Sequence, residues 1–162
     1  MKNTEKAFLW IIDIIERNNI TYKISGGFAA RVYGVNRELA DIDIEVSNKD
    51  ISIVASEAKP FIKFGPAKYK DDNWDLELLT LIYEGQEIDI AGVEAKIFNH
   101  ATKEWENSFA NLDNVNLIDV YSKIVRIETL DSLVTYKSKL ARDVDLEDVK
   151  QLLIIRAKET EK

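Results

Sequence analysis

The chain reads Ile24-Ser25-Gly26-Gly27-Phe28-Ala29 between an alternating segment and a short helical pattern. The alternation over 20–25 predicts a β-strand, and residues 28–33 predict a short helix that Gly34 closes. Glycine at such a junction lets the backbone approach a ligand closely, and a helix N-terminus offers free N–H groups to phosphate oxygens. Because a glycine pair at a strand end is often only a turn, these residues are a candidate phosphate site and no more.

A second strand is predicted over 41–46, where acidic and aliphatic residues alternate as Asp41-Ile42-Asp43-Ile44. Residues i and i+2 of a strand share a face, so both carboxylates point the same way while the isoleucines enter the core. Two close carboxylates repel each other, and a divalent cation is their natural neutraliser. A solvated strand face is the competing interpretation, because the chain is rich in acids and Glu45 continues the alternation.

A third acid, Asp89, lies in a strand-like segment further along the chain. Residues 76–83 and 86–91 read as two strands joined by Glu84-Gly85 in a tight hairpin. A lone acid in a strand is usually just surface, but this one could join the first two. We therefore expect the carboxylates of Asp41, Asp43 and Asp89 to cluster around one cleft at the edge of a sheet.

Helices and weaker strand signals surround this centre. Apolar residues recur at helical spacing near the N-terminus, which predicts an amphipathic helix over 4–17. Ser47 with Asp50 three positions later resembles a capping box that opens a helix ending near Lys59. Between residues 94 and 120 the signal weakens, and we expect irregular structure with one or two short strands.

The C-terminal part predicts two helices, over 130–141 and 145–156. Strands are thus expected mainly in the first hundred residues, and helices after them. The fold class is α/β (α+β): a small mixed β-sheet with flanking helices and a C-terminal helix pair.

Composition narrows the chemistry. The chain has 162 residues, 22 basic and 29 acidic, and 46% of them are hydrophobic, which suffices for one compact domain. The absence of cysteine excludes disulfides, thiolate zinc sites, iron–sulfur clusters and cysteine nucleophiles. The single histidine, His100, leaves no room for a histidine-rich metal cluster, and no motif surrounds it.

Charge and hydropathy bear on partners and location. The formal net charge of −7 argues against a broad surface that tracks duplex DNA. No segment approaches the roughly 20 apolar residues that span a bilayer, and the N-terminus carries no recognisable targeting signal. We expect a soluble, cytoplasmic protein without a membrane partner.

The motifs together resemble a known family. Gly26-Gly27 is followed after thirteen residues by Asp41-x-Asp43, and later by Asp89 in an apolar strand. This order is similar to that of the nucleotidyltransferase superfamily typified by DNA polymerase beta. Residues 24–46 most resemble its minimal bacterial and archaeal branch, which includes aminoglycoside- and lincosamide-modifying enzymes and the nucleotidyltransferases of abortive-infection and toxin–antitoxin systems.

The resemblance implies roles for particular residues. In the family, three carboxylates bind two magnesium ions, and the glycine pair contacts the nucleoside triphosphate (NTP). Carried over, Asp41 and Asp43 would hold both ions, Mg²⁺ or Mn²⁺, while Asp89 would ligate the ion near the attacking oxygen and take the acceptor's proton. The implied nucleotide-binding residues are Ser25, Gly26, Gly27, Arg37 and Lys137.

Two of the implied cations have competing interpretations. Arg37 could lean over the triphosphate or could be simply solvated as an exposed loop residue. Lys137 falls inside an apolar stripe of the predicted helix, where a lysine must snorkel to water or find an anion. That anion could be a phosphate or a nearby aspartate.

The sequence after Lys137 continues the resemblance. Arg142-x-x-Asp145-x-x-Asp148 is similar to the Arg-x-Lys-Asp-x-x-Asp-Ile turn that follows the equivalent lysine in this branch. Val144 stands where the family has a basic residue, so no role transfers to that position. We interpret Arg142 with Asp145 as a structural ion pair that fixes the helix turn.

The resemblance also implies a domain plan and an activity. Residues 1–100 would form the nucleotidyltransferase catalytic core, and 101–162 a C-terminal extension packed on it as one compact unit. The enzyme would move a nucleoside monophosphate from an NTP to an acceptor (a small hydroxylated molecule, a tRNA or a protein) and release pyrophosphate.

Two other functions remain open from the sequence. One is a catalytically silent module that binds a protein partner, for example in a toxin–antitoxin or phage-defence system; the intact acid triplet argues against it. The other is calcium or magnesium binding without catalysis. A protein partner or a homodimer is compatible with each of the three functions.

Overall fold

A computed structural model of the chain describes residues 1–161. Its α-helices are α1 (Thr4–Arg17), α2 (Gly26–Tyr33), α3 (Ile51–Glu57), α4 (Leu130–Leu140) and α5 (Asp143–Thr160), with 3₁₀ turns at Asn48–Asp50 and Lys59–Phe61. Its strands are β1 (Tyr22–Ser25), β2 (Asp41–Val46), β3 (Ile62–Lys70), β4 (Trp74–Tyr83), β5 (Gln86–Gly92), β6 (Lys96–Asn99), β7 (Glu104–Asn107), β8 (Val115–Val120) and β9 (Lys123–Glu128).

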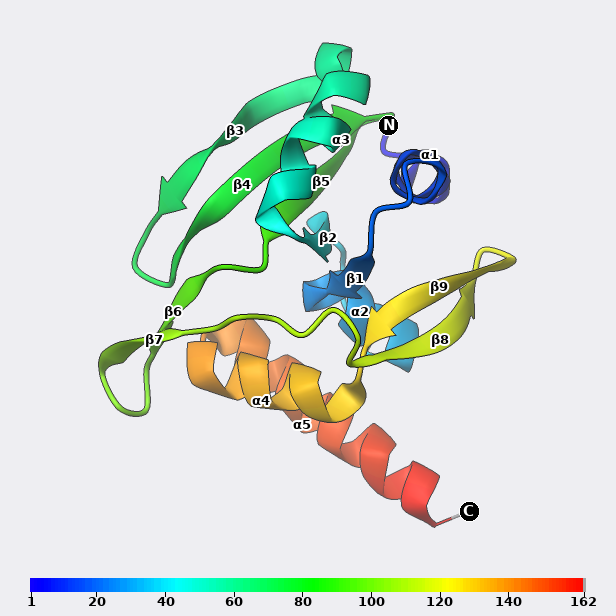
Figure 1. The fold of residues 1–162 in the computed structure, drawn as a ribbon. Coiled ribbons are helices and arrows are strands. Elements are labelled where there is room, and N and C mark those ends of the chain that lie inside the picture. Colours follow the sequence, from blue (N-terminus) through cyan, green and yellow to red (C-terminus); the bar gives the residue numbers. More distant parts are fainter. Residues whose placement is uncertain (162) are drawn as a thin grey trace.

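The strands of the described residues form one mixed sheet in the order β7-β6-β4-β5-β2-β1-β9-β8, with β3 paired to β4 (Figure 1). The centre of the sheet is β5-β2-β1, in which β2 runs parallel to β5 and antiparallel to β1. The sheet continues past residue 100, because β9 pairs with β1 in parallel and β8 pairs with β9. The division of the chain at residue 100 stays a prediction.

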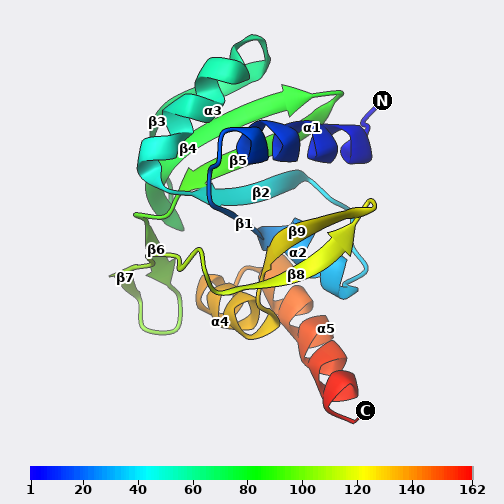
Figure 2. The same ribbon diagram turned by 45° about the vertical axis from the view of Figure 1, so that its right-hand side comes forward.

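Helices cover the sheet from two sides (Figure 2). Helices α1 and α3 lie across β2, β4 and β5, and the isoleucines of β2 are fully buried in the core. Helices α4 and α5 pack against each other and contact α2. In both views the end of α5 extends away from the sheet. Among residues 1–161, every helix is too short or too polar to cross a bilayer.

The predicted fold class is confirmed, and several elements match closely. Helix α1 and strand β2 have the predicted bounds, and β4 and β5 form the predicted hairpin. Its turn residues, Glu84 and Gly85, both have positive φ, 50° and 72°, as a two-residue type I′ turn requires. The C-terminal helix pair is also present, with α5 starting two residues earlier and ending four residues later than predicted.

Two expectations about elements were wrong, and strand β3 was not predicted. Strand β3 was missed because it is an edge strand with mostly exposed residues, so it lacks apolar alternation. The segment from 94 onwards is more regular than expected: it holds β6, β7 and β8, and β9 follows directly. The capping box at Ser47 does not form; its side chain makes no capping hydrogen bond, and a 3₁₀ turn precedes α3.

Candidate active site

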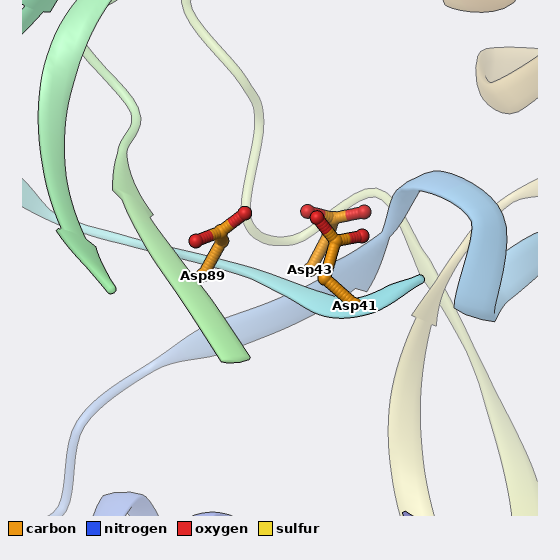
Figure 3. Close-up of side chains that lie close together, drawn as sticks. All are labelled: Asp41, Asp43 and Asp89. Carbon is orange, nitrogen blue, oxygen red and sulfur yellow. The ribbon is translucent and has the colours of Figure 1, made fainter. Parts of the chain in front are cut away.

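Three carboxylates meet where β2 and β5 run side by side. The parallel register places Asp43 directly opposite Asp89, and Asp41 lies two residues before Asp43 on the same face. One oxygen from each of the three carboxylates lies within 4.8 Å of the others (Figure 3). The predicted clustering of Asp41, Asp43 and Asp89 is therefore confirmed. Its expected place at the edge of the sheet was wrong, because β2 and β5 are central strands.

The cluster is electrostatically unfavourable without a cation. Burial raises the pKa of Asp43 well above its ordinary value, and the charges of Asp41 and Asp89 raise it further. Burial likewise raises the pKa of Asp89 to about 7, although a hydrogen bond from Thr80 Oγ1 to Asp89 Oδ1 (2.7 Å) opposes that shift. Oxygen-only donors with excess negative charge fit Mg²⁺ or Mn²⁺, which prefer such ligands.

The glycine pair begins α2 instead of preceding it, which corrects the expected helix start at Phe28. Gly26 has φ +63°, and a β-carbon there would overlap the Asp43 carboxylate. A β-carbon on Gly27 would lie 2.8 Å from Arg37 Nη1. Ser25, at the N-cap position, makes no capping hydrogen bond with its side chain. Glycine is therefore needed at position 26, where the positive φ and the adjacent Asp43 carboxylate exclude a side chain; at position 27 the contact is only with the far end of the flexible Arg37 side chain.

The two predicted cations share one buried aspartate. Lys137 Nζ lies 2.9 Å from Asp148 Oδ2, and Arg37 Nη1 lies 2.6 Å from the same oxygen. Lys137 is 2% exposed and also lies 3.6 Å from Asp145 Oδ1. Lys137 therefore pairs with aspartates, which is one of the alternatives expected for it. Simple solvation of Arg37 was wrong, because its side chain is ion-paired and 22% exposed.

The ion pair predicted between Arg142 and Asp145 is confirmed. Arg142 Nε and Nη2 lie 2.6 Å and 3.1 Å from the two oxygens of Asp145, which is fully buried. The backbone N–H of Arg142 also donates to this carboxylate, at 3.2 Å. Asp145 therefore fixes the start of α5 beside α4.

All eight predicted site residues line one cavity of about 520 Å³: Ser25, Gly26, Gly27, Arg37, Asp41, Asp43, Asp89 and Lys137. An aromatic wall that we did not predict completes it. Trp74 Nε1 donates to the Tyr136 hydroxyl at 2.6 Å, and the Arg142 guanidinium lies 4.8 Å from the Trp74 ring centre. The sequence offered no signal for this wall, because Trp74 and Tyr136 lie on separate elements.

His100 takes no part in this arrangement. Its Nε2 lies 2.9 Å from Asn73 Oδ1, its ring packs edge-on against Phe98, and it is not among the residues that line the cavity.

The mixed sheet, the carboxylates on its central strands and the flanking helix pair define a nucleotidyltransferase-type fold. A nucleotidyltransferase structure from Thermotoga maritima superposes with a TM-score of 0.71 at 15% identity, covering 100% of this chain and 97% of that one. The lincosamide antibiotic adenylyltransferase LnuA, bound to lincomycin, gives 0.66 at 21% identity and covers 96% and 99%.

A third similar structure is ANT(2'')-Ia in complex with adenylyl-2''-tobramycin, with a TM-score of 0.56 at 14% identity, covering 96% of this chain and 97% of that one. No protein-family model and no curated protein matches the sequence. These likenesses establish the fold.

Proposed function

We propose that this protein is a metal-dependent nucleotidyltransferase that transfers a nucleoside monophosphate from an NTP to an acceptor and releases pyrophosphate. The observation that carries the proposal is the cluster of Asp41, Asp43 and Asp89 within a cavity that basic residues also line. Two structures with the same fold, LnuA and ANT(2'')-Ia, are described with adenylyl transfer or an adenylylated product.

In the proposed reaction, an acceptor oxygen forms a bond to the α-phosphorus of the NTP. The bond between that phosphorus and the oxygen bridging to the β-phosphorus breaks, and pyrophosphate leaves with the electron pair. Asp89 takes the acceptor's proton as a general base. Thr80 orients Asp89 through its 2.7 Å hydrogen bond.

Asp41, Asp43 and Asp89 would hold two divalent cations, Mg²⁺ or Mn²⁺. When bound, such ions lower the pKa of the attacking hydroxyl and offset charge on the leaving pyrophosphate. The three carboxylates are held by the paired central strands β2 and β5, so little movement is needed before the metal binds.

The opposite wall of the cavity suits a triphosphate. Arg37, Lys137 and Arg142 carry three positive charges, whereas the buried Asp145 and Asp148 supply two negative ones. One positive charge is left for an anion at this wall. The first turn of α2 adds the backbone N–H groups of Gly26 and Gly27, which can donate hydrogen bonds to phosphate oxygens.

The acceptor is proposed to be a small hydroxylated molecule, with tRNA or a protein as alternatives. A test is to incubate the protein with Mg²⁺ and each NTP labelled at the α-phosphate, together with fractionated cell extract. The proposal predicts label on one fraction and release of pyrophosphate, both lost in Asp43→Asn. Equal labelling by that variant would refute the assignment of the site.

The cellular setting is part of the same proposal. An NTP-dependent enzyme works where nucleotides are plentiful, which agrees with the cytoplasmic location expected from the sequence. A homodimer or a protein partner remains a prediction of the sequence.

A further inference from the structure

Asp41 has less support from the sheet than the other two carboxylates of the cluster. Asp43 is paired on both sides, with Ser25 on β1 and with Asp89 on β5. Asp41 is the first residue of β2, and its pairing with Glu87 is the first of the β2–β5 ladder, whereas the pairing with β1 ends at Asp43. The position of Asp41 therefore depends on what fixes the residues just before it.

A loop, 35–40, precedes β2 and contains neither helix nor strand. Helix α5 fixes its first half, because the side chain of Gln151 accepts a hydrogen bond from the Asn36 N–H at 3.0 Å. Its last two residues, Leu39 and Ala40, line the cavity beside the carboxylates. Contacts that fix the backbone of these two residues also fix the start of β2.

Gln86 makes one of these contacts. It is the first residue of β5 and is fully buried. Its Nε2 donates to the backbone oxygen of Ala40 at 3.3 Å and to that of Glu87 at 2.9 Å. The side-chain amide thus links the segment before β2 to β5, next to the first pair of their ladder. Burial of an amide is costly unless it is hydrogen-bonded, so these partners determine its orientation.

The residues around the start of α1 complete this arrangement. Thr4 Oγ1 donates to Gln86 Oε1 at 2.7 Å, so both polar atoms of the amide have partners. Lys2 Nζ donates to the backbone oxygen of Leu39 at 2.6 Å. In both views this segment lies beside the turn between β4 and β5 (Figures 1 and 2). The end of the loop is therefore fixed from β5 and from the segment at the start of α1.

We propose that Gln86 is a positioning residue for the metal site: it fixes the backbone of Ala40 and thereby the carboxylate of Asp41, and Thr4 fixes Gln86. The inference rests on the proposed function, in which Asp41 binds a divalent cation. Gln86 is not among the residues that line the cavity, so it acts through Ala40 and touches no substrate. Loss of a group that orients a metal ligand typically lowers metal affinity or activity by about 10- to 100-fold.

The first test measures Mg²⁺ affinity by calorimetry on the full-length protein. Gln86→Met keeps the length of the side chain and removes the amide, and it should lower the affinity at least about tenfold. Asn99→Leu is the matched control, because Asn99 is also a buried amide that bonds to the backbone, at 2.9 Å from the Ala101 N–H, but does not line the cavity. The control should keep the affinity, whatever stability it loses. Unchanged affinity in a folded Gln86→Met would overturn the inference.

The second test needs no metal. Hydrogen exchange of the metal-free protein, followed by mass spectrometry, reports on peptides that contain residues 36–41. Exchange there should be about fivefold faster in Gln86→Met and in Thr4→Val, as expected for the loss of one hydrogen bond, and unchanged in Thr4→Ser, which keeps the hydroxyl. Equal exchange in Thr4→Val and the unaltered protein would refute the inference. Should Gln86→Met not fold, the two variants of Thr4 decide the case.

The two tests separate this inference from the proposed function. Equal Mg²⁺ affinity in Gln86→Met and the unaltered protein would refute the inference alone. Absence of Mg²⁺ binding by the unaltered protein would refute the proposed metal-dependent reaction, while faster exchange in Gln86→Met and Thr4→Val would still support the positioning of Asp41 by Gln86.

Discussion

The carboxyl group of Asp43 lies where burial and two neighbouring carboxylates disfavour its charged form and raise its pKa well above the ordinary value. The Asp43 side chain also packs closely against Gly26, and its carboxylate fits only because Gly26 has no side chain. A carboxyl group whose charged form is so disfavoured indicates a site for a ligand that stabilises the charged form. In this cluster of oxygen donors, the ligand that fits is a divalent cation.

The first prediction follows from this repulsion. Mg²⁺ should raise the melting temperature of the protein, because it binds the folded arrangement of carboxylates preferentially. Asp43→Asn should abolish the increment and leave the metal-free protein as stable as before, or slightly more stable. Asp13→Asn, on the surface of α1, is the control and should keep the full increment. An equal response of Asp43→Asn and the unaltered protein would mean that the cation binds elsewhere.

The second prediction concerns pH. The pKa of Asp89 is raised to about 7 on folding, so its contribution to metal-free stability is present below its ordinary pKa and lost as pH rises through about 7. Metal binding requires the ionised form, so the stabilisation by Mg²⁺ should grow over the same range. Melting curves with and without Mg²⁺ between about pH 5 and pH 8 will show this as diverging curves. A metal increment that stays constant with pH would contradict the prediction.

The junction of α4 and α5 positions the three basic side chains that line the cavity. Asp145 and Asp148 are buried in the first turns of α5 and hold Lys137 of α4, Arg37 and Arg142. Each of the two acids has at least two basic partners, so loss of one partner does not leave an unpaired buried charge.

The third prediction is that Lys137→Met folds but is destabilised by about 1.5–3 kcal/mol, the value of a hydrogen bond between charged groups. Asp148 keeps Arg37 as a partner, so the larger loss expected for a stranded carboxylate should not occur. Lys139→Met, on the exposed side of the same helix, should melt as the unaltered protein does. Urea denaturation measures the stability of both variants. NTP titration should show weaker binding in Lys137→Met and unchanged binding in Lys139→Met. Unchanged stability and unchanged NTP affinity in Lys137→Met would show that Lys137 neither stabilises the fold nor binds the nucleotide.

The hairpin shows how much local chemistry could be predicted from the sequence. The two-residue turn at Glu84-Gly85 fixes the register, which places Thr80 opposite Asp89. That partner could have been named in advance by counting from the turn. The bond between Arg142 and Asp145 was likewise readable, because the two residues lie three apart at a helix start.

Other features depend on contacts that no local pattern carries. Lys23, Glu45 and Glu128 meet only because β1 lies between β2 and β9, and that strand order is not written in any one segment. Strand β3 and the strands after residue 94 are short, exposed or at the edge of the sheet. Strands β3 and β7 therefore lack the alternation of buried and exposed residues from which strands are predicted, and β6 alternates over four residues only.

The molecule is held together across the boundary at residue 100. Ile127 of β9, Leu133 of α4 and Leu152 of α5 belong to the same buried core as β1 and β2. Residues beyond 100 also supply Lys137, Tyr136 and Arg142 to the walls of the cavity.

The fourth prediction is that a chain ending at residue 100 will not unfold cooperatively, because it lacks β9 beside β1 and the buried residues of α4 and α5. Thermal melting followed by circular dichroism checks this. A sharp transition in the truncated chain would show that residues 1–100 are an independent unit.

The central claim is that three aspartates bind metal and that the metal brings an NTP into the same cavity. Calorimetric titration of each NTP, with and without Mg²⁺, tests it on the unaltered protein and on Asp43→Asn. We predict that at least one NTP binds the unaltered protein, only when Mg²⁺ is present, and that Asp43→Asn does not bind it. Binding of Mg²⁺ without any NTP, or equal NTP affinity in the two proteins, would contradict the account.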